Sequence, residues 1–193
     1  LIPAVFGRLT YCFGATMAIR RSNLERFGAF DALADVLADD FMFGRLVHKQ
    51  GHRIALIPYI VENVIDDPSL KSLFFHELRW ARTIRSVEPY GYAASTITEI
   101  IPLAILGAAG IFVASGSFVY AGMFLAVAGA LRLALHYTIS STVPGRSTAN
   151  PLLLPLRDIM SPIIRLSSYF GREVTWRDRD FVIQSNVRLE PAE

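Results

Sequence analysis

Residues 74–85 read FFHELRWARTIR, and they lie immediately ahead of the long apolar part of the chain. Apolar residues recur here every three or four positions and form one stripe on a helix: Leu70, Phe74, Leu78, Ala81 and Ile84. Polar residues such as His76 and Thr83 line another face. This periodicity predicts an amphipathic helix over residues 69–87.

Three arginines of this helix recur at every third position, with a tryptophan beside them: Arg79, Arg82, Arg85 and Trp80. Two interpretations fit. In the first, the arginines anchor an interfacial helix at the headgroups of a bilayer, and Trp80 belongs to the aromatic belt. In the second, guanidinium forks bind the oxygens of a diphosphate, and the indole packs against a ring or chain. The two are compatible, because an enzyme that modifies lipids needs both.

The composition is typical of an integral membrane protein. Hydrophobic residues make up 52% of the 193 residues, charged residues 19%, and the mean hydropathy is +0.38. The formal net charge of +2 is too small to indicate a nucleic-acid partner. Cys12 is the single cysteine, which excludes an internal disulfide or zinc cluster. Because the chain starts at Leu1 and has no signal-peptide pattern, we expect it to be the C-terminal part of a longer protein.

The residues before this helix predict an α/β layer. Strands are expected over three segments: residues 9–19, 53–58 and 59–65. A short helix is expected from Ser22, with a capping box between Ser22 and Glu25 and a stop at Gly28. A second helix is expected over residues 41–50, ended by Gly51.

Asp39 and Asp40 precede this second helix. A helix N-terminus favours negative charge, so simple capping is one explanation. Capping needs one aspartate, however, and a second adjacent carboxylate must point elsewhere, which at a loop-to-helix junction usually means into a cleft. A functional role for the pair therefore stays open beside the capping role.

Two apolar segments, residues 96–115 and 118–137, have about the 20 residues needed to cross a bilayer. The polar turn Gly116-Ser117 joins them, so a transmembrane hairpin is predicted. Glycines along both segments would let the helices approach closely: Gly107, Gly110, Gly122 and Gly129. Arginines before the first segment, together with Arg132 and Arg146, place the α/β part in the cytosol by the positive-inside rule.

Charged residues interrupt a third apolar segment, residues 151–170: Arg157, Asp158 and Arg165. If it crossed the bilayer, the basic residues 172–193 would lie outside, against the positive-inside rule. We therefore predict a re-entrant or interfacial helix followed by a cytosolic tail. Arg157 and Asp158 could pair with each other, which would lower the free-energy cost of burying them and mark them as a possible membrane site.

The order of these motifs resembles membrane glycosyltransferases of families 2 and 21. Those enzymes have an acidic motif, then a motif Q/RxxRW, then transmembrane helices, and here ADDF (38–41) and HELRW (76–80) stand in that order. Further similar stretches are GATMAIRR (14–21), LRDIMSP (156–162) and the pair Trp176-Arg177. The resemblance is closest to hopanoid-biosynthesis glycosyltransferases and to ceramide glucosyltransferases, and it covers nearly the whole chain.

This resemblance implies a fold and a set of roles. Residues 1–92 would be the C-terminal part of a GT-A catalytic domain, and residues 93–171 the membrane region. Asp40 would be the general base that takes the proton of the acceptor hydroxyl, with its charged form favoured by the helix dipole. Asp39 would orient the acceptor or a loop. Arg79 would hold the diphosphate and Trp80 would wall the acceptor pocket.

His76 stands where the family often has Gln or Arg, so its implied role is open between substrate binding and a structural hydrogen bond. The donor would be a UDP-sugar, bound with Mg²⁺ or Mn²⁺ through an acidic DxD motif that lies earlier in such polypeptides. Asp178 and Asp180 also spell DxD, but in the basic tail, where we interpret them as chance; no metal ligand is predicted within these residues.

The predicted function is inverting transfer of a sugar, possibly N-acetylglucosamine, to a hopanoid hydroxyl at the cytosolic face of a bacterial inner membrane. The protein would be multi-pass, with the bilayer and a lipid acceptor as partners. A ceramide glucosyltransferase is the alternative enzyme. The alternative from another class is a non-catalytic two-span anchor or lipid-binding scaffold, in which the arginines meet only anionic headgroups.

Overall fold

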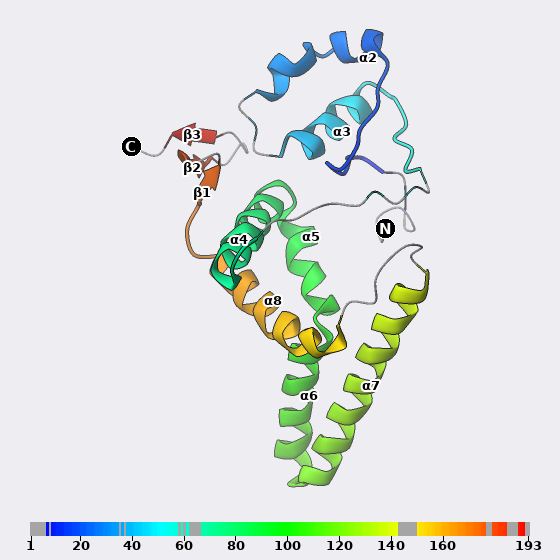
Figure 1. The fold of residues 1–193 in the computed structure, drawn as a ribbon, viewed down its shortest axis with the longest axis vertical. Helices are drawn as coiled ribbons and strands as arrows, with labels where there is room; N and C mark the ends of the chain where they lie inside the picture. Colours follow the sequence, from blue (N-terminus) through cyan, green and yellow to red (C-terminus); the bar gives the residue numbers. More distant parts are fainter. Residues whose placement is uncertain are drawn as a thin grey trace. The chain divides into compact units, whose positions relative to one another are not determined.

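The computed structural model describes residues 7, 9–34, 36, 38–57, 59, 61, 67–142, 150–176, 179–184 and 189–191. The chain forms two compact units. Unit 1 combines Leu1–Pro89 with Gly171–Glu193, and unit 2 is Tyr90–Phe170. The C-terminal residues, predicted as a separate tail, are thus folded together with the N-terminal part of the chain (Figure 1).

Unit 1 begins with short helical elements: α2 (Arg21–Glu25), the 3-10 helix η1 (Ala29–Leu33) and α3 (Asp39–Lys49). The helix predicted after residue 41 is confirmed as α3. The predicted capping box is wrong, because Arg20 is the N-cap of α2 and makes no side-chain capping bond. Helix α2 ends at Glu25 with Arg26 as its C-cap, two residues before the predicted stop, and Gly28 is the N-cap of η1, at a φ of 90° that favours glycine.

A small apolar core holds these elements together. Its buried members are Leu33, Phe43 and Val47, and partly buried side chains pack around them: Cys12, Ile19, Leu24, Phe27, Met42, Leu46 and Ile54. Phe27 meets Phe43 edge-on, with ring centroids 5.8 Å apart. The core is therefore built by helix α3, by α2 and η1, and by irregular segments on either side of these helices.

Two of the predicted N-terminal strands are wrong as far as the structure describes them. Residues 9–19 and 52–57 form no strand, and most of the third predicted strand lies outside the described residues. A strand needs a neighbour for its backbone N–H and C=O groups, and no described segment pairs with these residues. The apolar run after residue 9 lies on helix α3 instead, at Gly44, as described below.

Helix α4 (Leu70–Val87) confirms the amphipathic helix predicted over residues 69–87. It begins with a capping box in which the Ser69 and Ser72 side chains each bind the other residue's backbone N–H. The middle of the apolar stripe is buried at Leu78 and Ala81, whereas Leu70 at its start is 61% exposed.

A three-stranded antiparallel sheet follows at the C-terminal end of the chain: β1 (Glu173–Trp176), β2 (Arg179–Ile183) and β3 (Leu189–Pro191). The strand order is β1-β2-β3, with Glu173 opposite Val182 and Val182 opposite Glu190. Val174 and Ile183 are its buried residues within the described part. Among the described residues, strands occur in this sheet alone, and not in the N-terminal part of the chain where the α/β layer was predicted.

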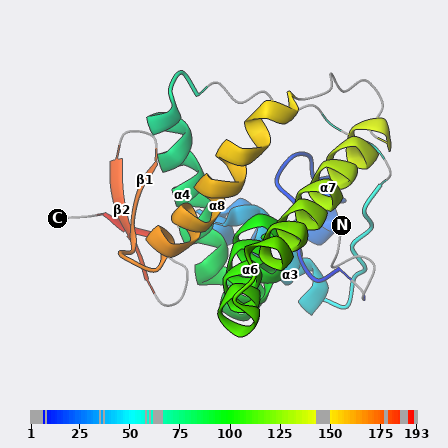
Figure 2. The same ribbon diagram turned by 90° about the horizontal axis from the view of Figure 1, so that it is seen from below.

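Unit 2 is helical: α5 (Pro89–Ala94), η2 (Ser95–Thr98), α6 (Ile100–Ser115), α7 (Phe118–Thr142), η3 (Pro151–Leu153) and α8 (Leu154–Ser168). Helices α6 and α7 pack side by side and are joined at Gly116, whose φ is 65° (Figures 1 and 2). A Cβ on Gly107 would lie 2.8 Å from the Phe124 ring, so this glycine permits the close approach. Gly110, Gly122 and Gly129 meet no such neighbour, which corrects their predicted packing role within unit 2.

Among the described residues, α7 is the one helix that is both long and apolar enough to cross a bilayer by itself, with 11% of its apolar window buried. A second candidate arises if the segment Pro89–Thr98 and α6 count as one span, although the chain bends by 65° between them. Helix α8 has 15 residues, fewer than a span requires.

Candidate active site

The acidic pair lies at the N-terminus of α3. Ala38 is the N-cap and offers no side-chain acceptor. Each carboxylate instead accepts from the next backbone N–H: Asp39 Oδ1 from Asp40 N at 2.9 Å, and Asp40 Oδ1 from Phe41 N at 2.8 Å. Asp39 is exposed and Asp40 is half-buried. The two carboxylates therefore differ in exposure to solvent, and the less exposed one is that of Asp40, the predicted general base.

Burial raises the pKa of the Asp40 carboxyl above its ordinary value. The backbone N–H groups of Phe41, Gly14 and Asp40 lower this pKa, and the charge of Asp39 raises it further. The helix terminus was expected to favour the ionised form, and this expectation is wrong for the net effect, because loss of solvent outweighs the backbone N–H groups. A carboxylate whose pKa is raised is a stronger base than an ordinary aspartate carboxylate.

A segment far away in sequence, residues 11–14, packs on this end of α3. The Tyr11 ring stacks on Phe41 with centroids 4.9 Å apart, and the Arg45 guanidinium lies over the same Phe41 ring at 5.7 Å. Burial raises the pKa of Tyr11, and the charge of Glu88 at the C-cap of α4 raises it as well. Tyr11, from the start of the chain, is thus in contact with Phe41 of α3 and feels the charge of Glu88 at the end of α4. Sequence reasoning missed this role of Tyr11, because no spacing rule connects position 11 with position 41.

Helix α4 carries the other predicted site residues. His76 Nδ1 lies 3.0 Å from Asp67 Oδ2, and the His76 ring meets Trp80 edge-on at 4.6 Å. The side chain of Asp67 is 14% exposed, so this contact is largely shielded from water. Trp80 is 38% exposed. Asp67 therefore holds His76, and His76 in turn packs against the indole.

The three arginines spaced along α4 differ in whether their guanidinium groups bind another described residue. Burial lowers the pKa of Arg79, and no described carboxylate or carbonyl pairs with its guanidinium. Arg82 donates to the backbone carbonyl of Glu173, and Arg85 Nη2 donates to that of Gly171 at 3.2 Å. The three arginines were predicted to present one cationic surface, but two of them bind the start of the C-terminal sheet. Arg79 is the member left for an external anion.

No hydrogen bond or ion pair among the described residues joins Asp40 to Arg79, so the roles that the resemblance gives them in one reaction stay a prediction. A cavity of about 430 Å³ lies by the C-terminal end of α3, away from Asp40. Its lining residues are Gly7, Leu9, His48, Gly51, His52, Arg53, Ile54 and Leu56. None of the predicted site residues lines this cavity.

The comparison with protein families bears on these two motifs together. The sequence profile of Glycosyl transferase family 21 matches residues 2–189, which covers both motif helices and the apolar helices after them. The chain belongs to glycosyltransferase family 21. No curated protein and no solved structure matches it. The protein is therefore a glycosyltransferase of the membrane family 2/21 kind, and the alternative of a non-catalytic scaffold is set aside.

In the apolar part of the glycosyltransferase, Asp158 has a different partner from the predicted Arg157. Asp158 pairs with Arg132 on α7, with Nε and Nη2 each 3.0 Å from a carboxylate oxygen. Arg157 is exposed on α8. The predicted Arg157–Asp158 pair is therefore wrong: the two residues are adjacent on a helix and point in different directions, whereas Arg132 comes from a neighbouring helix. The bidentate pair fastens α8 to α7.

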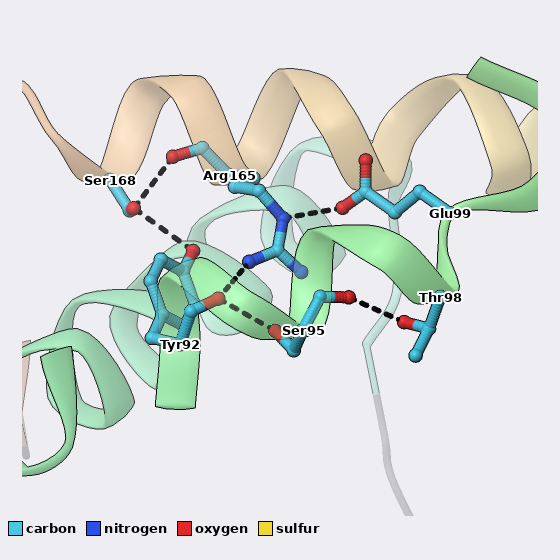
Figure 3. A network of polar contacts seen from close by, with 6 residues as sticks. All are labelled: Tyr92, Ser95, Thr98, Glu99, Arg165 and Ser168. Carbon is cyan, nitrogen blue, oxygen red and sulfur yellow. Dashed lines mark hydrogen bonds and ion pairs between the residues drawn. The ribbon is translucent and has the colours of Figure 1, made fainter. Parts of the chain in front are cut away.

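A second buried network fastens α8 to the region where α5 and α6 meet (Figure 3). Arg165 on α8 pairs with Glu99, donates to the Tyr92 carbonyl at 2.7 Å and lies 4.6 Å from the centroid of the Tyr92 ring. The Tyr92 hydroxyl is 3.0 Å from Ser168 Oγ, which is fully buried. The sequence shows these polar residues, but nothing in their spacing predicts that they meet.

The described residues of the glycosyltransferase contain no group of three or more His, Cys, Asp or Glu side chains that could hold a metal ion. Asp178 of the DxD stretch in the basic tail lies outside the residues that the structure describes. The divalent metal that the resemblance implies, with ligands earlier in such polypeptides, stays a prediction, and no chemical step below is routed through one.

Proposed function

We propose that this glycosyltransferase moves a sugar from a UDP-sugar to a hydroxyl group of a membrane lipid, with inversion at the anomeric carbon. The observation that carries the proposal is the state of Asp40 in a family 21 chain: a half-buried carboxylate, held by backbone N–H groups, whose pKa is raised by burial. A general base at physiological pH needs a pKa raised toward the working range.

The chemistry follows from one carboxylate. The acceptor oxygen forms a bond to the anomeric carbon as the bond from that carbon to the diphosphate oxygen breaks. The hydroxyl proton passes to Asp40, and the electron pair of the broken bond leaves with the nucleoside diphosphate. Because the attack is direct, a single displacement inverts the configuration, and no nucleophile from the protein is required.

Arg79 would stabilise the charge that develops on the leaving diphosphate. Its guanidinium is partly desolvated and has no described partner, so binding an anion would break no existing ion pair. Trp80 would border the acceptor, and the Asp67–His76 contact would hold this indole in place. Asp39, exposed beside the base, would orient the acceptor.

The membrane location is supported by the apolar surfaces of unit 2. Helix α7 can span a bilayer, and few of its residues are buried by the protein. Helix α8 and its flanking residues expose apolar side chains at helical spacing: Leu152, Leu156, Ile159, Ile163, Leu166 and Phe170. The opposite side of α8 is held by Asp158 and Arg165. A helix of this kind is suited to lie in the interface of the bilayer, which is the role that we propose for residues 151–170.

The acceptor that we favour is a hopanoid hydroxyl, with UDP-N-acetylglucosamine as the donor; ceramide and UDP-glucose are the second acceptor and donor pair. Both rest on the sequence resemblance described above. The proposed location is the cytosolic face of the bacterial inner membrane, which the arginine distribution around the apolar helices supports.

The test uses the full-length enzyme in membranes, incubated with labelled UDP-sugars and a panel of polycyclic and sphingoid lipids. We expect one labelled lipid of inverted anomeric configuration, and its loss in Asp40→Asn. Asp31→Asn is the matched control, because Asp31 is an exposed aspartate in the first turn of η1. Full turnover by Asp40→Asn would remove Asp40 from the reaction, and labelling of no lipid by the wild type would refute the proposed acceptor class.

A further inference from the structure

The contact between residues 11–14 and helix α3 depends on two glycines, one on each side. A Cβ on Gly44 would lie 2.5 Å from the Cα of Tyr11, a distance that real Cβ atoms do not adopt. Gly44 therefore lets the backbone of Tyr11 and Cys12 lie directly against the helix. Asp40 is one turn earlier on α3, on the same side as Gly44.

The second glycine meets the carboxylate itself. A Cβ on Gly14 would lie 2.9 Å from Asp40 Oδ2 and 3.3 Å from Asp40 Cγ. The segment thus runs along one face of α3, from Gly44 at Tyr11 to Asp40 at Gly14. The backbone N–H of Gly14 also favours the charged form of this carboxylate.

We propose that Gly14 is a positioning residue for the general base: the missing side chain lets the Asp40 carboxylate pack on the backbone of residues 11–14 and fixes the direction in which it faces the acceptor. This inference rests on the role of Asp40 in the proposed function. It adds a residue outside the acidic motif, twenty-six positions earlier in the chain.

A methyl group at position 14 tests this directly. The conflict would be with the end of a side chain and not with backbone, and Gly14 is not among the glycines with positive φ, so alanine leaves the fold possible while the carboxylate must move. Displacement of a catalytic group by about 1 Å commonly costs on the order of a hundredfold in rate. We expect Gly14→Ala to lower kcat by roughly ten- to a hundredfold, with the KM for the donor nearly unchanged.

A double-mutant cycle separates positioning from general damage. If Gly14 acts through Asp40, then Gly14→Ala added to Asp40→Glu, which keeps a carboxylate and a measurable rate, causes a smaller loss of transfer than Gly14→Ala causes in the wild type. Gly7→Ala is the control, because an added Cβ there meets no atom within 4 Å. An unchanged kcat in Gly14→Ala, or a further loss in the double variant equal to that in the single one, would overturn the proposal.

A second measurement needs no sugar transfer, so it stays informative if the proposed donor or acceptor is wrong. Cys12 lies close enough for the charge of Asp40 to raise its pKa, and burial raises it too. The charged and titratable groups described around this site are Asp39, Asp40, Cys12 and Tyr11, together with Glu88, whose charge acts on Tyr11, and Arg45, which lies over the Phe41 ring. Alkylation of Cys12, followed against pH by mass spectrometry of its peptide, therefore reports on the carboxylate.

We expect Asp40→Asn to lower the pH at which Cys12 reacts, and Gly14→Ala to shift that pH as well, while Gly7→Ala leaves it unchanged. A shift in Asp40→Asn without one in Gly14→Ala would show that Gly14 does not hold the carboxylate. If neither variant shifts the titration, the carboxylate does not lie against residues 11–14, and the proposal fails whatever the transfer assay shows.

Discussion

Replacing Arg165 by methionine should destabilise the protein strongly, because it leaves a buried carboxylate without its partner. The side chain of Glu99 is 8% exposed and that of Arg165 is 16% exposed, so water replaces the lost contact poorly. The variant also loses the donor to the Tyr92 carbonyl and the cation above the Tyr92 ring. Methionine has a similar length and a good helix propensity, so the change removes mainly the charge.

Breaking one side of a buried ion pair costs about 3–5 kcal/mol. The contact with the Tyr92 ring contributes about 0.5–2 kcal/mol, but it belongs to the same network and is not added to the first figure. A protein of this size loses about 2–4 °C of melting midpoint per kcal/mol. The expected decrease in midpoint for Arg165→Met is therefore about 6–20 °C.

The assay is thermal unfolding of the purified full-length enzyme in detergent, at one fixed scan rate. Arg157→Met is the matched control, because Arg157 lies on the same helix and is exposed; its effect should be within about 0.5 kcal/mol. A double variant, Arg165→Met with Glu99→Leu, should recover most of the loss, since a buried pair replaced on both sides by apolar groups is often neutral. A midpoint for Arg165→Met equal to that of Arg157→Met would refute the reasoning.

Four further predictions concern unit 1. Asp40→Asn should abolish transfer without lowering the melting midpoint: burial raises the pKa of Asp40, so above that pKa the desolvated charge opposes folding, and removing it stabilises the fold. In the wild type, kcat should fall as the pH decreases through this raised pKa, so an acidic limb at or below the ordinary aspartate value of about 3.9 in the pH–rate profile would contradict the burial argument. Arg79→Lys should lower kcat roughly ten- to a hundredfold in the transfer assay, because an ammonium group cannot reproduce the bidentate fork; unchanged kinetics would exclude a bidentate contact. Gly44→Ala should lower the free energy of unfolding by about 1–3 kcal/mol or more in denaturant titrations, because its Cβ would lie 2.5 Å from the Tyr11 Cα, whereas Gly7→Ala should have little effect.

Local patterns predicted the helices well. The apolar stripe and polar start of α4 set its bounds almost to the residue, and Gly51, with a φ of 80°, follows α3 as expected. Both results depend on spacing and capping within one or two turns of helix, which a sequence displays directly. The family resemblance also came from two short motifs in order, and the match to residues 2–189 agrees with it.

Strands were predicted poorly, because a strand is stabilised by a partner that its own residues do not specify. The run after residue 9 has the apolar character of a buried strand, yet it lies irregularly on α3. The sheet that does form joins three consecutive C-terminal segments, β1 to β3, which can pair through short connections.

The sequence by itself determined the helices that carry both motifs, the acidic pair at a helix start, and the apolar helices that follow. Only the tertiary structure decided how the charged groups are used: that Asp158 pairs with Arg132, that Arg165 reaches Glu99, and that Arg79 alone of its row has no described partner. It also decided that burial raises the pKa of Asp40, whose carboxylate lies against Gly14. The physical reason is that helix formation depends on neighbours within a few residues, whereas ion pairing and desolvation depend on which distant segments approach.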